Sequence, residues 1–283
     1  MKNRIPGLVG LTAVVALALS ACGSSDPAAP AAGASSVIDK IASDKKLTIG
    51  IKFDQPGLGL RNPDNTYSGF DVSVAKYVAK ELGVEESAIT FKETPSASRE
   101  TALKNKEVDL IFATYSITDK RKAEVSFAGP YFVAHQDLLV KSDAADITGP
   151  DAMDGKILCS VKGSTSALKI QTDYSKQVQL KEYGGYSDCV NALKTGAVDA
   201  VTTDDIILAG FAEQNAGAFK VVGKGFSDEK YGVGLWKDDT KTRDAVNAAI
   251  TKMQTDGSWK KALEEAVGKS GYAVPEPPAI SEK

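Results

Sequence analysis

Apolar residues in this chain occur alternately in short continuous runs and in stretches with helical spacing. The segment DVSVAKYVAKEL, residues 71–82, places Val74, Val78 and Leu82 on one face, and Gly83 then forms a C-terminal cap. Strands that alternate with amphipathic helices indicate an α/β fold, with parallel-rich sheets flanked by helices. The same pattern predicts strands at 47–51, 89–92, 109–113, 156–161, 179–183 and 199–203, and helices at 99–105, 165–171, 186–195, 205–214, 240–255 and 258–267.

Two segments far apart in the chain share a pattern. LKNKEVDLIFAT (103–114) and LKTGAVDAVTTD (193–204) each contain Leu-Lys, three residues, Val-Asp and then a strand. This repetition predicts two similar lobes in which Thr114 and Asp204 occupy equivalent strand ends. Because ligands of open α/β sheets bind beyond the carboxyl ends of the strands, we expect a cleft where these two ends face each other.

Two extended segments connect the expected lobes. Residues 129–141 leave the first lobe and residues 228–237 return to it, and both are suited to be paired hinge strands. The Pro-rich end, AVPEPPAISEK, is expected to be a loose tail. The predicted organisation is lobe 1 at 37–131 plus 233–272, lobe 2 at 136–229, hinges at 132–135 and 230–232, and the tail at 273–283.

The first residues are those of a secretory signal. A basic start precedes an apolar run at 8–19, which is too short to span a bilayer, and small residues lead to Cys22. The sequence ALSAC resembles the bacterial lipoprotein processing site, which implies removal of residues 1–21 and a lipid such as palmitate on Cys22. The alternative is an ordinary signal with a cysteine near its cleavage site. The small and polar composition of residues 22–36 is typical of a flexible tether.

Composition narrows the choice of partner and of metal chemistry. A net charge of −3 argues against nucleic acid, so a strong anion site has to be local. With Cys22 assigned to lipid, Cys159 and Cys189 remain. An even pair in an exported protein favours a disulfide over two free buried thiols. Two distant cysteines and a single histidine, His135, argue against a metal site, and no cofactor is expected.

The segment DLIFATYSITDKR (109–121) ends a buried strand in an unusual way. Its apolar part is followed by Thr114, Ser116 and Thr118 and then by Arg121. Polar residues at this point either let the strand leave the core, or they gather hydroxyls, backbone N–H groups and a guanidinium around an anion.

The expected folded region resembles the solute-binding proteins of ABC transporters for polar amino acids, the bacterial extracellular solute-binding proteins of family 3. The resemblance rests on GFDVSVAKYVAKELG, VDLIFATYSITDKRKAEVSFAGPYF, VKGSTS, VDAVTTDD and YGVGLWKDDTKTRDAVNAAITKMQTDGSWKKALEEA. One departure is VSFAGPY (125–131), where the family often has Asp-Phe-Ser. The resemblance implies a two-lobed periplasmic-binding-protein fold of type II that closes on its ligand by a hinge motion.

The resemblance also assigns roles to residues at both strand ends. Arg121 matches the arginine that clamps the α-carboxylate of the bound amino acid, together with Ser116, Thr114 and Thr165. Asp204 matches the carboxylate that receives the α-ammonium, and Thr114 contributes there too. These matches favour the interpretation in which the polar residues after the strand bind an anion. The alternative for Arg121 is a solvated surface position.

Selectivity is expected from two further cations and a hydroxyl. Lys52 and Arg99 match basic positions of the glutamate/aspartate-binding branch, and Ser96 lies on the same loop as Arg99. Two such buried cations would be uncompensated beside a neutral side chain, so a second ligand carboxylate is their natural partner. The alternatives are a surface position at a helix start for Arg99 and a structural pair with Asp54 for Lys52.

These inferences predict a binding protein for L-glutamate, with aspartate as a second ligand and glutamine or another polar amino acid as the alternative. The expected partners are the permease subunits of an ABC importer with a cytoplasmic ATPase, and the membrane through a lipid on Cys22. We expect a monomer that is lipid-anchored to the cell membrane outside the cytoplasm and is not an enzyme. Two other classes stay open: a dehydratase-like enzyme on the same fold, with Glu100 or Asp54 as general acid, and an extracytoplasmic sensor subunit.

Overall fold

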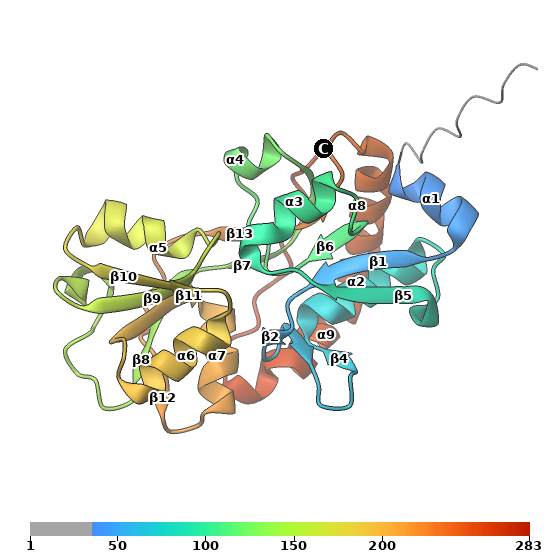
Figure 1. Cartoon of the computed structure of the whole chain (residues 1–283). Helices are drawn as coiled ribbons and strands as arrows, with labels where there is room; N and C mark the ends of the chain where they lie inside the picture. The colour runs from blue at the N-terminus through green and yellow to red at the C-terminus, as the bar shows by residue number, and fades with distance from the viewer. Residues whose placement is uncertain (1–35) are drawn as a thin grey trace, which may run out of the picture. The chain divides into compact units, whose positions relative to one another are not determined.

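The computed structural model describes residues 36–283, which form two large sheets and a small one. The sheet with the order β5-β1-β6-β13-β7 defines lobe 1, and the sheet with the order β10-β9-β11-β8-β12 defines lobe 2 (Figure 1). In each, the first three strands run parallel and the other two pair antiparallel. The strands are β1 (Leu47–Ile51), β5 (Ile89–Glu93), β6 (Leu110–Phe112), β7 (Ser126–Ala134), β8 (Gln136–Lys141), β9 (Ile157–Val161), β10 (Gln179–Tyr183), β11 (Ala200–Asp204), β12 (Phe219–Val221) and β13 (Glu229–Leu235).

The predicted internal repeat is confirmed by this topology. β6 and β11 both stand third in their sheets, where each runs parallel to its neighbour β1 or β9. Thr114 follows the end of β6 by two residues, and Asp204 is the last residue of β11. The two strand ends are therefore equivalent positions of two similarly built lobes.

Helices pack on the sheets through their apolar faces. α2 buries Phe70, Val74 and Val78 completely, and the Phe70 ring packs edge-on against Trp259 of α9 at 5.6 Å between centroids. The helices of lobe 1 are α1 (Val37–Asp44), α2 (Phe70–Glu81), α3 (Arg99–Lys104), α4 (Asp119–Lys122), α8 (Thr240–Thr255) and α9 (Ser258–Val267). Those of lobe 2 are α5 (Ser166–Lys169), α6 (Tyr186–Thr195) and α7 (Asp205–Gln214).

The chain passes between the lobes in two strands that pair with each other. β7 and β13 are in register from Ser126 opposite Leu235 to Ala134 opposite Glu229, with an irregularity between Tyr231 and Val233. The segments predicted as hinges, 132–135 and 230–232, lie at the lobe 2 end of this two-stranded ribbon. Their bending stays a prediction.

Short elements were missed by the sequence pattern. These are α1, α4, β12, the small antiparallel sheet of β2 (Asp54–Gln55), β3 (Gly59–Arg61) and β4 (Tyr67–Ser68), and the single-turn helices η1 (Glu86–Ala88), η2 (Ser96–Ser98), η3 (Pro150–Met153) and η5 (Gly268–Ser270). The helix predicted at 165–171 is α5 followed by a π-helical turn, η4 (Ile170–Tyr174). Strands of two residues and single turns contain too few positions for a period to be recognised.

The prediction of a loose C-terminal tail is wrong. The N–H groups of Ser281 and Glu282 donate to the Gly129 carbonyl at 2.9 and 3.0 Å, and the Asn247 side chain donates to the Glu282 carbonyl at 2.7 Å. Ile280 packs against the larger cluster of buried apolar side chains. The prolines of the tail already restrict its backbone, so less conformational entropy is lost when it docks than in an ordinary segment.

Several predictions concern residues that the structure does not describe. The signal at 1–21, the lipid on Cys22 and tether residues 23–35 lie outside the described residues. From residue 36 onward, no helix is both long enough and apolar enough to cross a membrane.

A disulfide links β9 to α6 in lobe 2, as the paired cysteines predicted. Cys159 and Cys189 are both fully buried, and their Cα atoms lie 5.6 Å apart. Their separation of 30 residues in sequence makes the bond a cross-link between a strand and the second helix after it.

We expect replacement of both cysteines, Cys159→Ser with Cys189→Ser, to lower the free energy of unfolding by about 3–4 kcal/mol. A bond that closes a loop of this length restricts the unfolded chain by about that amount. Urea unfolding of the variant and the parent, both carrying Cys22→Ser, measures the difference. Equal midpoints and slopes would show that the bond contributes nothing to stability.

Candidate functional site

The carboxyl ends of β6 and β11 face each other across a small cavity. It has a volume of about 10 Å³, and polar residues of both lobes line it. This is the size of a single water molecule, so the two walls are almost in contact and the lobes are closed. Lobe 1 contributes Ser96, Arg99, Thr114, Ser116 and Arg121, and lobe 2 contributes Ser164, Thr165, Tyr186, Thr203, Asp204 and Ile207.

Hydrogen bonds and one ion pair hold Arg121 at the wall of this cavity. Thr118 caps α4 by accepting a hydrogen bond from the Arg121 N–H at 3.2 Å, which fixes the backbone. The guanidinium donates through Nη1 to the Ser116 carbonyl at 2.7 Å and through Nη2 to the Gly163 carbonyl at 2.9 Å, and its Nε lies 3.3 Å from Glu100. One N–H on each terminal nitrogen remains for a carboxylate, which suits bidentate binding. The alternative of a solvated Arg121 is wrong, since its side chain is buried.

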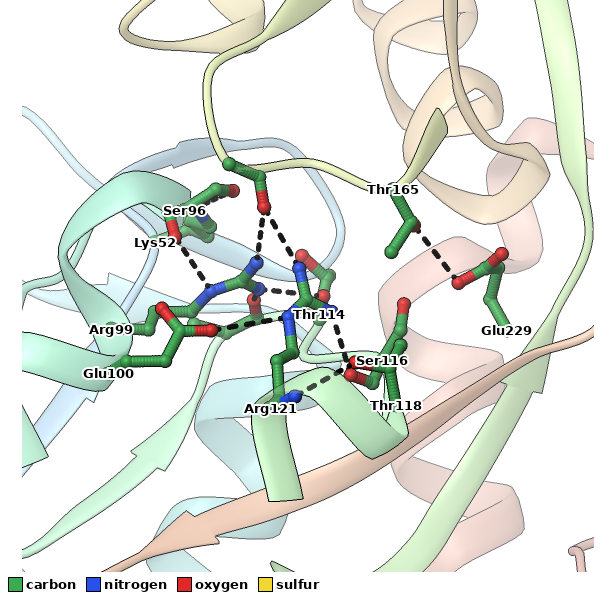
Figure 2. A network of polar contacts seen from close by, with 12 residues as sticks. Lys52, Ser96, Arg99, Glu100, Thr114, Ser116, Thr118, Arg121, Thr165 and Glu229 are labelled. Atoms are coloured by element: carbon green, nitrogen blue, oxygen red, sulfur yellow. Dashed lines mark hydrogen bonds and ion pairs between the residues drawn. The ribbon is translucent and has the colours of Figure 1, made fainter. Parts of the chain in front are cut away.

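Arg99 lies beside Arg121 and is also buried (Figure 2). Its Nη1 donates to the carbonyls of Ala113 and Thr114 at 2.9 and 3.1 Å, and its Nη2 donates to the Gly163 carbonyl at 3.4 Å. Burial, and after it the charge of Arg121, lower the pKa of Arg99 to about 10, so the guanidinium stays charged at neutral pH. The alternative of an exposed Arg99 at a helix start is therefore wrong.

Lys52 adds a third buried cation close to the two arginines. Its Nζ donates to Ser96 Oγ at 2.7 Å. Burial, followed by the charge of Arg99, lowers the pKa of Lys52 well below its ordinary value. Of the alternative structural pair with Asp54, no hydrogen bond is formed, because the Asp54 carboxylate binds Ser187 of lobe 2. The charge of Asp54 still partly offsets the lowering of the Lys52 pKa, so the two residues interact electrostatically.

Asp204 supplies an anionic group on the opposite wall. Its Oδ2 accepts a hydrogen bond from the Tyr231 hydroxyl at 2.5 Å, whereas its buried Oδ1 has no partner among the described residues. Burial, and after it the charge of Glu229, raise the pKa of Asp204 to about 8. A cation at Oδ1 would satisfy this oxygen and favour the ionised carboxylate.

Thr114 occupies the strand end in a left-handed conformation, with φ of 45°. The buried Asp71 carboxylate holds it there, since Oδ2 accepts from the Thr114 N–H at 2.9 Å and Oδ1 from the Tyr131 hydroxyl at 2.7 Å. Burial raises the pKa of Asp71 to about 6. The Thr114 hydroxyl donates to Gln55 at 3.2 Å.

The structure brings the predicted residues together, with Lys52 joined to the cavity wall through Ser96. Four lining residues were missed: Ser164, Tyr186, Thr203 and Ile207. Ser164 and Thr203 directly precede predicted site residues, and this adjacency could have indicated them. Tyr186 opens α6, whose position next to the cavity depends on tertiary packing. The Thr165 hydroxyl donates to Glu229 at 3.1 Å, a partner that the sequence did not suggest.

Within residues 36–283, no three or more His, Cys, Asp or Glu side chains are grouped so that they could hold a metal ion.

Gly163 is the point at which lobe 2 touches the two arginines. Its φ is +81°, and a Cβ atom there would lie only 2.7 Å from the Cα of Ala97 in lobe 1. A side chain at this position would meet backbone that cannot move aside easily, so the close approach of the lobes requires glycine.

We therefore expect Gly163→Ala to hold the lobes apart. Small-angle scattering should show a larger radius of gyration than for the parent. Gly155→Ala is the matched control, because Gly155 also has a positive φ, +73°, yet has no atom within 4 Å of the added Cβ. If both variants scatter like the parent, the contact at Gly163 does not limit closure.

The chain is similar to proteins that bind small solutes. The family model described as "Bacterial extracellular solute-binding proteins, family 3" matches residues 47–269. The chain is 46% identical over 286 residues to the "Glutamate-binding protein GluB" of Corynebacterium efficiens, covering 98% of this chain and 95% of that protein. It is 36% identical over 261 residues to the "ABC transporter glutamine-binding protein GlnH" of Bacillus subtilis, covering 91% and 94%.

Solved structures share the arrangement of two lobes. "An ancestral arginine-binding protein bound to glutamine" superposes with a TM-score of 0.72 at 32% identity, covering 79% of this chain and 98% of that one. The cysteine-binding protein of Campylobacter jejuni shares the fold with a TM-score of 0.79 at 24% identity, over 88% and 100%. The model match and the near full-length relatives show that this chain belongs to the bacterial extracellular solute-binding proteins of family 3.

Proposed function

We propose that this protein binds L-glutamate outside the cytoplasm, with L-aspartate as a second ligand, and delivers it to an ABC importer when its two lobes close. The observation that carries the proposal is the set of three buried basic side chains, Lys52, Arg99 and Arg121, gathered opposite an Asp204 oxygen that has no partner among the described residues. A zwitterion with a neutral side chain would compensate one cation and one anion only. A dicarboxylic amino acid supplies a second carboxylate, which offsets the cost of the remaining buried positive charge.

The proposed roles follow the geometry. Arg121 uses its two remaining N–H groups for the α-carboxylate, with Ser116 and Thr165 beside it. Asp204 receives the α-ammonium at Oδ1, with Thr114 nearby. Arg99, Lys52 and Ser96 face the side-chain carboxylate. The relatives at 46% identity are named as glutamate-binding proteins, which supports this choice.

Glutamine is the second candidate. Arg99 already donates to four backbone carbonyls, those of Ser96, Ala113, Thr114 and Gly163. These bonds disperse its charge, so an uncharged amide would suffice at this end of the site. The relatives named as glutamine-binding proteins, at 36% and 39% identity, are consistent with this reading.

We also propose that the protein returns its ligand unchanged and is held at the membrane by a lipid on Cys22. The one histidine, His135, does not line the cavity, and its Nδ1 contacts Ser227 and Asp228 instead. Incubation with L-glutamate followed by amino-acid analysis would detect turnover. Metabolic labelling with a palmitate analogue, compared with a Cys22→Ser variant, would detect the lipid.

Calorimetric titration should show 1:1 binding of L-glutamate that is tighter than binding of L-glutamine. The protein is first unfolded and refolded to remove carried ligand. Lys52→Gln is expected to weaken glutamate binding at least tenfold, about 1.4 kcal/mol, with a smaller effect on glutamine. Arg121→Ala should weaken both by about 2–5 kcal/mol, as when one partner of a buried charge pair is truncated.

Lys46→Gln is the matched control for Lys52→Gln, because Lys46 is an exposed lysine of the same lobe. Equal losses for glutamate and glutamine in Lys52→Gln would move Lys52 out of the side-chain site. Binding of neither amino acid by the parent protein would refute the proposed function.

Ligand binding is expected to release a proton from Asp204. In the closed protein the pKa of this carboxyl is about 8, so it is largely protonated at pH 6. An α-ammonium beside it favours the ionised form, so the contribution of Asp204 to affinity rises with pH between 6 and 8, by at most about tenfold per unit.

The pKa of Lys52 is lowered, and a bound carboxylate favours its protonated form, so Lys52 takes up a proton on binding. The measured proton balance therefore has to be divided between Lys52 and Asp204. The proton release of Asp204 is the difference between the parent and Asp204→Asn, measured by calorimetry in buffers of unequal ionisation enthalpy. The same proton balance in both proteins would show that Asp204 does not meet the ammonium.

A further inference from the structure

A hollow of about 310 Å³ lies at the side-chain end of the cleft, between the lobes. It is lined by Lys52, Phe53, Asp54, Glu93 and Pro95 of lobe 1 and by Val161 and residues 184–188 of lobe 2. On its wall the Asp54 carboxylate, half-buried in β2, crosses to the first turn of α6. Its Oδ2 accepts from the Ser187 N–H at 3.1 Å and from the Ser187 hydroxyl at 3.2 Å.

α6 has no side-chain cap of its own. Its N-cap residue is Gly185, and no side chain of the helix accepts from the N–H groups of the first turn at that cap. A Cβ atom at Gly185 would lie 2.6 Å from Asp54 Oδ2, so the glycine leaves room for the carboxylate. Aspartate is among the best N-cap residues, and its charge is favourable at the positive end of a ten-residue helix. Asp54 therefore caps α6 from the opposite lobe.

A cap that comes from the other lobe exists only while the lobes are together. The first turn of α6 also carries Tyr186, whose hydroxyl donates to Ser164 at 2.9 Å and whose ring lines the cavity. When the lobes close, the Ser187 N–H at the start of α6 therefore gains a hydrogen-bond acceptor, next to the proposed ligand. When the lobes open, this N–H loses that acceptor.

We propose that Asp54 is a positioning residue, which caps α6 across the cleft in the closed state and slows the release of the ligand. This inference rests on the proposed function, capture of an amino acid by closure of the lobes. The Asp54 side chain donates to or accepts from no residue of the proposed ligand site: its hydrogen bonds go to Ser187. Its charge also reaches Lys52, where it partly offsets the lowering of the Lys52 pKa by burial. Its effect is expected on dissociation, because the cap forms after the ligand has entered.

The test compares Asp54→Ala with Asp54→Asn by stopped-flow measurement of L-glutamate binding and release. Asp54→Ala should raise the dissociation rate constant about 3- to 30-fold, the range expected for loss of a helix cap, and leave the association rate constant unchanged. Asp54→Asn should restore most of the slow release, since asparagine also caps helices well. Glu85→Ala, which removes an exposed acid of the same lobe, should behave like the parent.

Amide hydrogen exchange of the Ser187 N–H provides a readout that does not depend on glutamate. Exchange should be faster in Asp54→Ala than in the parent, and close to the parent in Asp54→Asn. If the parent does not bind glutamate but exchange follows this order, the proposed function fails and the cap stands. Unchanged exchange and unchanged release in Asp54→Ala would overturn the inference. So would equal losses in both variants, because charge and not capping would then be responsible.

Discussion

One backbone carbonyl of lobe 2 is shared by the two buried arginines of lobe 1. Gly163 of lobe 2 accepts hydrogen bonds from both Arg121 and Arg99 of lobe 1, at 2.9 and 3.4 Å. Two guanidiniums side by side repel each other, and they can be buried together only because fixed oxygen atoms surround them. The residues that follow β6 provide three of these oxygens, the carbonyls of Ala113, Thr114 and Ser116. The others are the Ser96 carbonyl, the Glu100 carboxylate and the Gly163 carbonyl. Both lobes thus supply acceptors for the buried guanidiniums.

The charges of the site are arranged for a ligand that carries more negative than positive charge. Arg99 remains cationic at neutral pH, while much of Asp204 is protonated in the closed protein, because its pKa there is about 8. The closed site therefore presents excess positive charge, which favours carboxylates. The ammonium group then meets a carboxyl that ionises in response. Glutamate has two carboxylates and one ammonium, so its charges match those of the site better than the charges of glutamine do.

Much of the architecture could be predicted because it rests on long periodic elements. α8 and α9 begin and end where the spacing of apolar residues placed them, and the matching strand ends at Thr114 and Asp204 followed from the repeated Val-Asp signal. The contacts across the cleft could not be predicted. Asp54 lies close to Lys52 in sequence, and a local pair was the alternative reading of Lys52, yet the hydrogen-bond partner of Asp54 is Ser187, 133 residues away. Contacts of this kind depend on how the two lobes pack against each other. A local sequence pattern does not predict that packing.

The disulfide between Cys159 and Cys189 has a consequence for how the cleft opens. Cys159 stands on β9, whose end leads into Gly163, and Cys189 stands on α6, whose start carries Ser187. Two of the lobe 2 groups that contact lobe 1, the Gly163 carbonyl and the start of α6, are therefore linked covalently through β9 and α6. We expect the contacts of these two groups with lobe 1 to break together when the cleft opens, and not one after the other. A cell compartment that keeps thiols oxidised would then affect how the cleft opens as well as the stability of lobe 2.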